Sequence, residues 1–93
     1  MFNIKKLVRK MKRYDLDEME TLQRTSRNLR DYVKKWIYYA NCDNFEDMTI
    51  YAKLAIASMI YIQENYPLET YIAVYSIYES ELMEMKEFLM KEN

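Results

Sequence analysis

The chain contains no glycine, and Pro67 is its only proline. These two residues form most tight turns, and sheet proteins need many turns because each strand has to be followed by one. Their scarcity therefore predicts a few long helices joined by short loops. The 93 residues, about half of them apolar, are enough for one hydrophobic core. We expect an all-α fold in a single domain, residues 1–93, built as a small antiparallel helical bundle.

The most apolar part of the chain is residues 48–62, MTIYAKLAIASMIYI. Its polar residues are Thr49, Lys53 and Ser58. A helix that is apolar nearly all round has to be covered on several sides. We therefore predict that the third helix, residues 45–64, forms the centre of the bundle. A polar substitution at Leu54 or Ile56 is expected to unfold the protein.

Two heptad patterns flank this central stretch. The first consists of Met19, Leu22, Ser26, Leu29, Val33, Trp36 and Ala40, with the serine as its polar exception. The second consists of Leu68, Tyr71, Tyr75, Tyr78, Leu82, Met85 and Leu89. Steps of three and four residues place a seam along one side of a helix. The patterns predict a second helix that ends near residue 40 and a continuous fourth helix that runs to about residue 91, and their seams would cover the third helix.

A shorter helix is predicted before these three, over residues 2–14. Its apolar face consists of Ile4, Leu7, Val8 and Met11, and basic residues fill the rest of its surface. The second and third helices are expected to be joined by the loop of residues 41–44. Because no glycine is available there, an asparagine would adopt the left-handed conformation that ends the second helix. Asp43 or Asn44 would then cap the third helix.

Charge is divided unevenly along the chain, although the net charge is only −1. Residues 1–40 contain eleven Lys or Arg and five Asp or Glu, whereas residues 41–93 contain three and ten. The two halves of opposite charge can attract each other within one bundle. The uneven division can also provide binding surfaces. The acidic candidates for binding a protein are Glu79, Glu81, Glu84 and Glu87. The basic candidates for binding a nucleic acid are Lys5, Lys6, Arg9, Lys12, Arg13, Arg24, Arg27, Lys34 and Lys35.

The composition excludes several kinds of enzyme site. Without glycine there is no P-loop, no dinucleotide-binding fingerprint and no nucleophile elbow. Without histidine the commonest general base and the commonest zinc ligand are missing. Cys42 is the only cysteine, and with no basic residue beside it in sequence we expect an unreactive thiol. We predict that the protein is not an enzyme and has no catalytic residue, no metal site and no cofactor.

The distribution of apolar residues predicts a soluble protein. The basic N-terminus is not followed by an apolar stretch of signal-peptide length, and residues 48–62 are too short for a membrane span. The abundance of Ile, Lys, Asn, Tyr and Met is typical of A/T-rich coding sequences, as in low-GC bacteria and their phages. We expect a cytoplasmic location, which is the host cytoplasm if the chain is phage-encoded, and no membrane partner.

Three hypotheses for function remain, and the first is a binding module that blocks a larger protein or nucleoprotein. In size and helical composition the chain is similar to small phage-encoded inhibitors of host or defence proteins, anti-CRISPR proteins among them, and to bacteriocin immunity proteins. This similarity rests on no matched residues, so no site is taken from it. The second hypothesis is nucleic-acid binding through the first helix and the basic stripe of residues 24–35, which has Tyr32, Tyr38 and Tyr39 next to it. The third is a homodimer formed through the apolar residues 71–78.

Overall fold

The structure, a computed structural model, describes residues 16–91, with side chains from residue 20 onward. Its elements in chain order are the helices α2 (Leu16–Asn41), α3 (Phe45–Asn65), α4 (Leu68–Ile77) and α5 (Glu79–Lys91). No strand occurs in this part of the chain. The predicted all-α fold is confirmed. The helix predicted over residues 2–14 lies outside the described residues.

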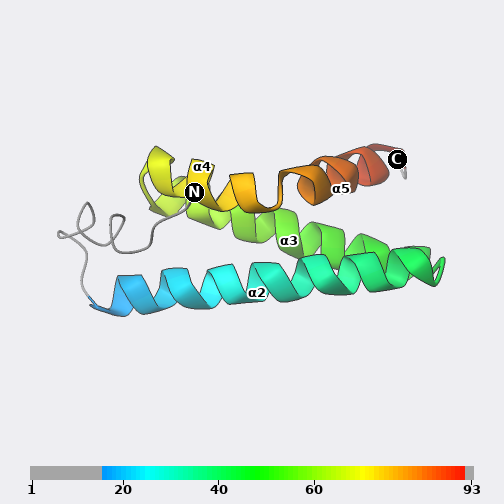
Figure 1. Ribbon diagram of the computed structural model, residues 1–93, viewed down its shortest axis with the longest axis horizontal. Helices are drawn as coiled ribbons and strands as arrows, with labels where there is room; N and C mark the ends of the chain where they lie inside the picture. Colours follow the sequence, from blue (N-terminus) through cyan, green and yellow to red (C-terminus); the bar gives the residue numbers. More distant parts are fainter. Residues whose placement is uncertain (1–15, 92–93) are drawn as a thin grey trace.

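The helices form three layers, with α3 in the middle (Figure 1). α2 runs along one side of α3 in the opposite direction, and α4 and α5 follow one another along another side. Helix α3 packs against all three of the others, whereas α2 makes few contacts with α4 or α5. The described chain is therefore an antiparallel bundle in which one helix holds the other layers together.

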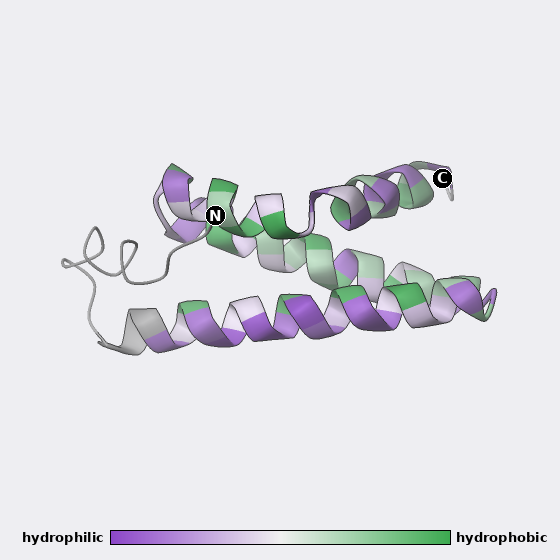
Figure 2. Ribbon diagram, in the orientation of Figure 1, coloured by the Kyte–Doolittle hydropathy of each residue, from purple (hydrophilic) through white to green (hydrophobic). Residues whose placement is uncertain are grey.

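The predicted seam of α2 faces α3. Its central members Leu29, Val33 and Trp36 are buried, and its remaining described members are partly buried. The hydropathy of α2 alternates along the helix for this reason, with hydrophilic residues on its outer side (Figure 2). On α3 the buried residues also follow steps of three and four, and they are Met48, Ala52, Ala55, Met59 and Ile62. The small alanines in this set allow the backbones of neighbouring helices to approach closely.

The expectation that Leu54 of α3 is a core residue is wrong. Leu54 is 39% exposed, whereas Ile56 is partly buried and packs against the core. Ile50, Ile60 and Tyr61 are exposed as well. The reason is that α2 and the α4–α5 layer leave the outer side of α3 uncovered. An apolar sequence all round a helix thus predicted more coverage than the described residues provide.

The turn between α2 and α3 is made without glycine. Asp43 adopts the left-handed conformation, with φ of 55°, so this role falls to an aspartate and not to an asparagine as expected. Asn44 caps α3, because its Oδ1 accepts a hydrogen bond from the backbone N–H of Asp47 at 3.2 Å. Its Nδ2 donates to the Asp47 carboxylate at 2.7 Å. Asn44 and Asp47 are therefore joined by two hydrogen bonds across the first turn of α3, and one of the unpaired backbone N–H groups at the helix start is satisfied.

The predicted continuous fourth helix is interrupted at Tyr78, which separates α4 from α5. The backbone N–H of Tyr78 bonds three residues back, to Tyr75 O at 3.1 Å. A regular helix would place Val74 and Leu82 about 80° apart around its axis, since it turns about 100° per residue. Both are buried, and the interruption allows each half to turn its own buried side toward α3. The β-branched and aromatic residues of α4 have low helix propensity, which favours a break here.

The start of α4 also departs from the predicted seam. Leu68 is 67% exposed, whereas Thr70 is fully buried. Leu68 is the first residue of its helix and lies beyond the reach of the core. The Thr70 hydroxyl has no hydrogen-bond partner, and neither has the buried Nε1 of Trp36. Both groups lie in a core whose other buried members are hydrophobic.

Candidate protein-binding surfaces

The described residues contain no cluster of three or more His, Cys, Asp or Glu side chains that could hold a metal ion. None of the helices between residues 16 and 91 is long and apolar enough to cross a membrane. Cys42 is free and exposed at the end of the bundle. The negative charge and the hydrogen bond of its sulfur raise the pKa of the neighbouring Tyr38 phenol.

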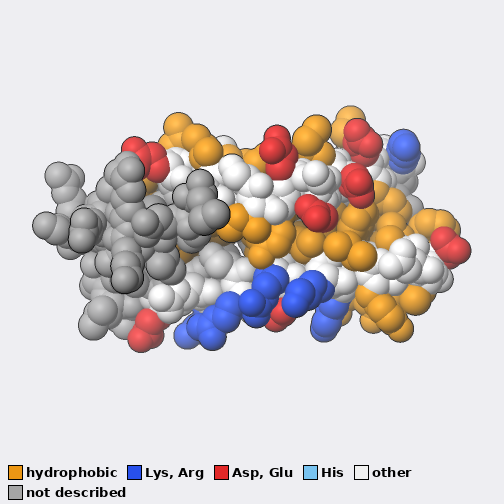
Figure 3. All heavy atoms as spheres, in the orientation of Figure 1, with side chains coloured by type: hydrophobic (Ala, Val, Ile, Leu, Met, Phe, Trp, Pro, Cys, Tyr) orange, Lys and Arg blue, Asp and Glu red, His pale blue; other side chains and the backbone are white. Residues whose placement is uncertain are grey.

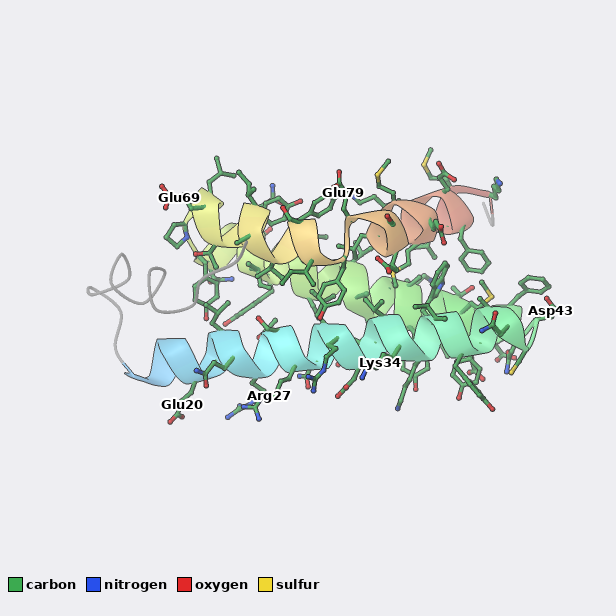
Figure 4. The ribbon with its side chains drawn as sticks, in the orientation of Figure 1. Glu20, Arg27, Lys34, Asp43, Glu69 and Glu79 are labelled. Atoms are coloured by element: carbon green, nitrogen blue, oxygen red, sulfur yellow. The ribbon has the colours of Figure 1, made fainter. Side chains whose placement is uncertain are left out.

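The four glutamates predicted as an acidic face lie on two different sides of α5. Glu79 points away from α2, at the outer edge of the bundle (Figure 4). Steps of four, four and three residues place Met83, Glu87 and Met90 on the same side of the helix. Met83 is 51% exposed and Met90 is 76% exposed. We call these four residues the α5 outer face.

The other two glutamates, Glu81 and Glu84, lie on the side of α5 that turns toward α2. Phe88 lies on the same side, because Glu84 follows Glu81 after three residues and Phe88 follows it after seven. On α2 the matching side consists of Arg30, Lys34 and Ile37, with the same heptad spacing. We call these six residues together the α2/α5 face. Figure 3 shows the division: Lys and Arg side chains line α2, acidic side chains line α4 and α5, and hydrophobic side chains lie between them.

Tyr78 lies where the two sides of the α2/α5 face meet. Burial raises the pKa of its phenol, the positive charge of Arg30 lowers it, and Asp31 and Glu81 raise it further. These influences place Arg30 of α2 and Glu81 of α5 close to one tyrosine. The two helices run in the same direction (Figure 1), so residues seven positions further along each helix again lie at matching heights.

The charges of the α2/α5 face are not neutralised by one another. An ion pair joins Arg30 Nε and Asp31 Oδ1 at 3.9 Å, and both side chains are more than half exposed. Lys34, Glu81 and Glu84 have no ion-pair partner within the described chain. Exposed pairs of this kind contribute little to stability. The opposite charges are thus held at the surface with an apolar band between them.

The basic candidates divide at residue 16. Lys5, Lys6, Arg9, Lys12 and Arg13 lie outside the described residues, whereas Arg24, Arg27, Lys34 and Lys35 are exposed along α2. Figure 4 shows Arg27 on the outer edge of this helix and Lys34 further along it. Lys35 turns instead to the opposite flank from Arg30, where its Nζ lies 5.3 Å from the centre of the Tyr51 ring. The described basic residues therefore lie along one helix, and one of them, Lys35, contacts an aromatic ring.

The tyrosines beside this stripe mostly contact one another. The rings of Tyr39 and Tyr51 are stacked with centres 5.6 Å apart, and Tyr32 lies 6.3 Å from Tyr51. Tyr38 meets Tyr39 edge to face at 5.1 Å. Aromatic pairs of this geometry add to the stability of a fold. These rings join α2 to α3, and a base could stack only on the faces that they leave free.

The sequence predicted which residues are acidic but not which surfaces they form. Residues Glu79, Glu81, Glu84 and Glu87 follow one another at intervals of two and three, and such spacing spreads them over more than half of the helix circumference. Met83 and Met90 were not predicted, although their four- and three-residue spacing from the outer glutamates is visible in the sequence. Arg30 and Ile37 were not among the predicted site residues, because their position beside α5 depends on the packing of the helices. The chain matches no protein-family model, no curated protein and no solved structure.

Proposed function

We propose that this protein is a non-enzymatic binding module that occupies a surface of a larger protein or nucleoprotein and blocks it, as small inhibitors from phages or mobile elements do. The proposal rests on one observation, the α5 outer face, where two exposed methionines alternate with two exposed glutamates. Met83 and Met90 offer flexible apolar contact surface. Glu79 and Glu87 add negative charge beside it.

This chemistry determines the kind of partner. A surface that combines apolar methionines with acidic glutamates suits a partner surface whose exposed aliphatic or aromatic residues are bordered by Lys or Arg. A methionine surface accepts partners of several shapes, because its side chains rearrange at low cost. The charges would increase the rate of association and exclude acidic competitors. The expected partner is a basic, partly apolar surface such as that of a nucleic-acid-binding protein.

Affinity capture from an extract of the source organism, followed by mass spectrometry, tests the proposal. The wild-type chain is compared with E79K/E87K and with M83S/M90S. The control is E20K/E64K, which makes the same charge change at exposed positions on α2 and α3. A partner that is captured by the wild type and the control but lost with both variants supports the proposal. Equal recovery of all proteins by all four chains would exclude the α5 outer face as the binding surface.

Nucleic-acid binding is the second candidate, and the exposed row Arg24, Arg27 and Lys34 on α2 favours it. Binding to phosphates by such a row weakens steeply with salt, because counterions are released. A mobility-shift titration at low salt with double- and single-stranded DNA and RNA measures it. If R24E/R27E/K34E shifts a probe as strongly as the wild type does, or if no probe shifts at all, this candidate is excluded.

A further inference from the structure

The α2/α5 face has opposite charges on its two edges and an apolar band between them. Arg30 and Lys34 form the positive edge, and Glu81 and Glu84 form the negative edge. Ile37, 40% exposed, is in line with the positive edge. The ring of Phe88 lies 6.5 Å from that of Phe45, which is exposed at the start of α3. We propose that this face binds a second copy of the same chain, giving a two-fold symmetric dimer with parallel helices.

The argument begins with symmetry. An isologous dimer brings the same surface of two copies together, so the surface has to complement itself. A two-fold axis parallel to the helices exchanges the two edges of the α2/α5 face. Helix α2 of one copy then lies over α5 of the other, and each positive edge meets a negative edge. This happens twice in the dimer, so the two rows of charge that face solvent in each copy, four rows in all, are paired.

The heights of the charged residues agree with this axis. Rotation about an axis parallel to the helices leaves the position along them unchanged. Arg30 and Glu81 approach the same side chain, that of Tyr78, from two helices that run in the same direction (Figure 1), and we take them to lie at similar heights in one copy. They therefore also meet across the dimer, and Lys34 meets Glu84 one turn further along. Ile37 and Phe88 follow seven residues after Arg30 and Glu81 and would form the apolar contact.

The competing two-fold axis, perpendicular to the helices and in the same plane, is disfavoured by the same charges. It would place α2 against α2 and α5 against α5. Arg30 and Lys34 of the two copies would then face like charges, and so would Glu81 and Glu84. Repulsion of this kind at an interface is costly. The face thus selects the parallel arrangement.

The dimer is independent of the α5 outer face. Glu79, Met83, Glu87 and Met90 lie on a different side of α5 and stay exposed in both copies. It also differs from a homodimer through residues 71–78, since Tyr71 and Tyr75 line a hollow on the opposite flank, with Ile56 and Met59 of α3. If the α5 outer face captures no partner, the proposal of a dimer is therefore not affected. If the protein is monomeric, the proposal of a partner bound by the α5 outer face is not affected.

Analytical ultracentrifugation of the full chain from about 1 μM to 1 mM tests the proposal, since this range covers weak and strong association. The wild type is expected to form dimers as its concentration rises. R30E/K34E and E81K/E84K should each weaken dimerisation by about tenfold or more, because every charge contact becomes repulsive. The control R24E/K53E reverses two cations elsewhere and should dimerise like the wild type. E79K/E87K should do so too.

Mixing provides the decisive measurement. When R30E/K34E is mixed with E81K/E84K, the heterodimer has one contact with both charges reversed and one contact with the wild-type charges. Both contacts are attractive, so the mixture should dimerise although neither variant does so alone. R30E/K34E/E81K/E84K should dimerise by itself for the same reason. A wild type that stays monomeric at all concentrations, reversals without effect, or a mixture that stays monomeric would each overturn the proposal.

Discussion

At the scale of single residues, polar side chains in this glycine-free chain provide the helix ends. Asp43 takes the left-handed position, and Asn44 and Asp47 close the start of α3. The loop in which this happens was predicted, and so was the choice of Asp43 or Asn44 as cap. Which residue would be left-handed was not predictable, because aspartate and asparagine both tolerate this conformation.

Loss of the α3 cap is expected to destabilise the protein measurably. Asn44→Ala removes the acceptor for the Asp47 N–H and should lower the free energy of unfolding by about 1 kcal/mol. Asn44→Ser, which keeps a neutral acceptor, should lower it much less. Urea denaturation followed by circular dichroism measures both. Asn28→Ala on the exposed side of α2 is the control, and a change at Asn28 as large as that at Asn44 would contradict the role of the cap.

Tyr78 should make stability depend on pH in the alkaline range. Burial raises the pKa of its phenol above the ordinary value of 10.0, so the folded state holds the proton more tightly than the unfolded state does. This contribution to stability is complete below the pKa of the unfolded tyrosine and is lost as the pH rises through the folded value. The free energy of unfolding of the wild type should thus fall more steeply above about pH 10 than that of Tyr78→Phe. Urea denaturation at pH 8 to 11 measures the difference, and parallel profiles would contradict the raised pKa.

At the scale of elements, the periodicity of apolar residues was sufficient to predict the buried side of α2, but it was insufficient to predict the buried sides and the bounds of the other helices. The seam of α2 was predicted because one side is apolar and the other is charged. In α3 apolar residues occur on all sides, so the pattern could not show that Ala52 and Ala55 face the core while Leu54 does not. The break at Tyr78 was not predictable from a glycine or proline, because neither occurs there. It follows from packing of both halves on α3.

The contrast between core and outer positions gives a direct test. Leu29→Ala, at a fully buried position of α2, should lower the free energy of unfolding by roughly 2–5 kcal/mol, because it removes buried side-chain atoms and leaves a cavity. Leu54→Ala makes the same chemical change on the outer side of α3 and should cost well under half as much. Thermal and urea unfolding of both variants check this. Equal losses would mean that the outer side of α3 is covered in solution.

At the scale of the whole molecule, the uneven charge of the sequence becomes a charge division in space. The basic residues of the described chain lie mostly along α2, and the acidic residues lie mostly along α4 and α5 (Figure 3). The sequence predicted attraction between these halves, but it could not show that the oppositely charged edges stay apart across an apolar band. That separation depends on α3, which holds the outer layers at a distance from each other. The proposed dimer derives from this separation.

The middle position of α3 also has a kinetic consequence. Because α4 and α5 are attached through α3 and make few contacts with α2, they can detach together while α2 and α3 remain paired. Backbone amides of α4 and α5 should therefore exchange with deuterium faster than those in the centre of α3, through an opening smaller than complete unfolding. Mass spectrometry of exchanged peptides resolves the two classes, and uniform protection of all four helices would show that the bundle opens only as a whole.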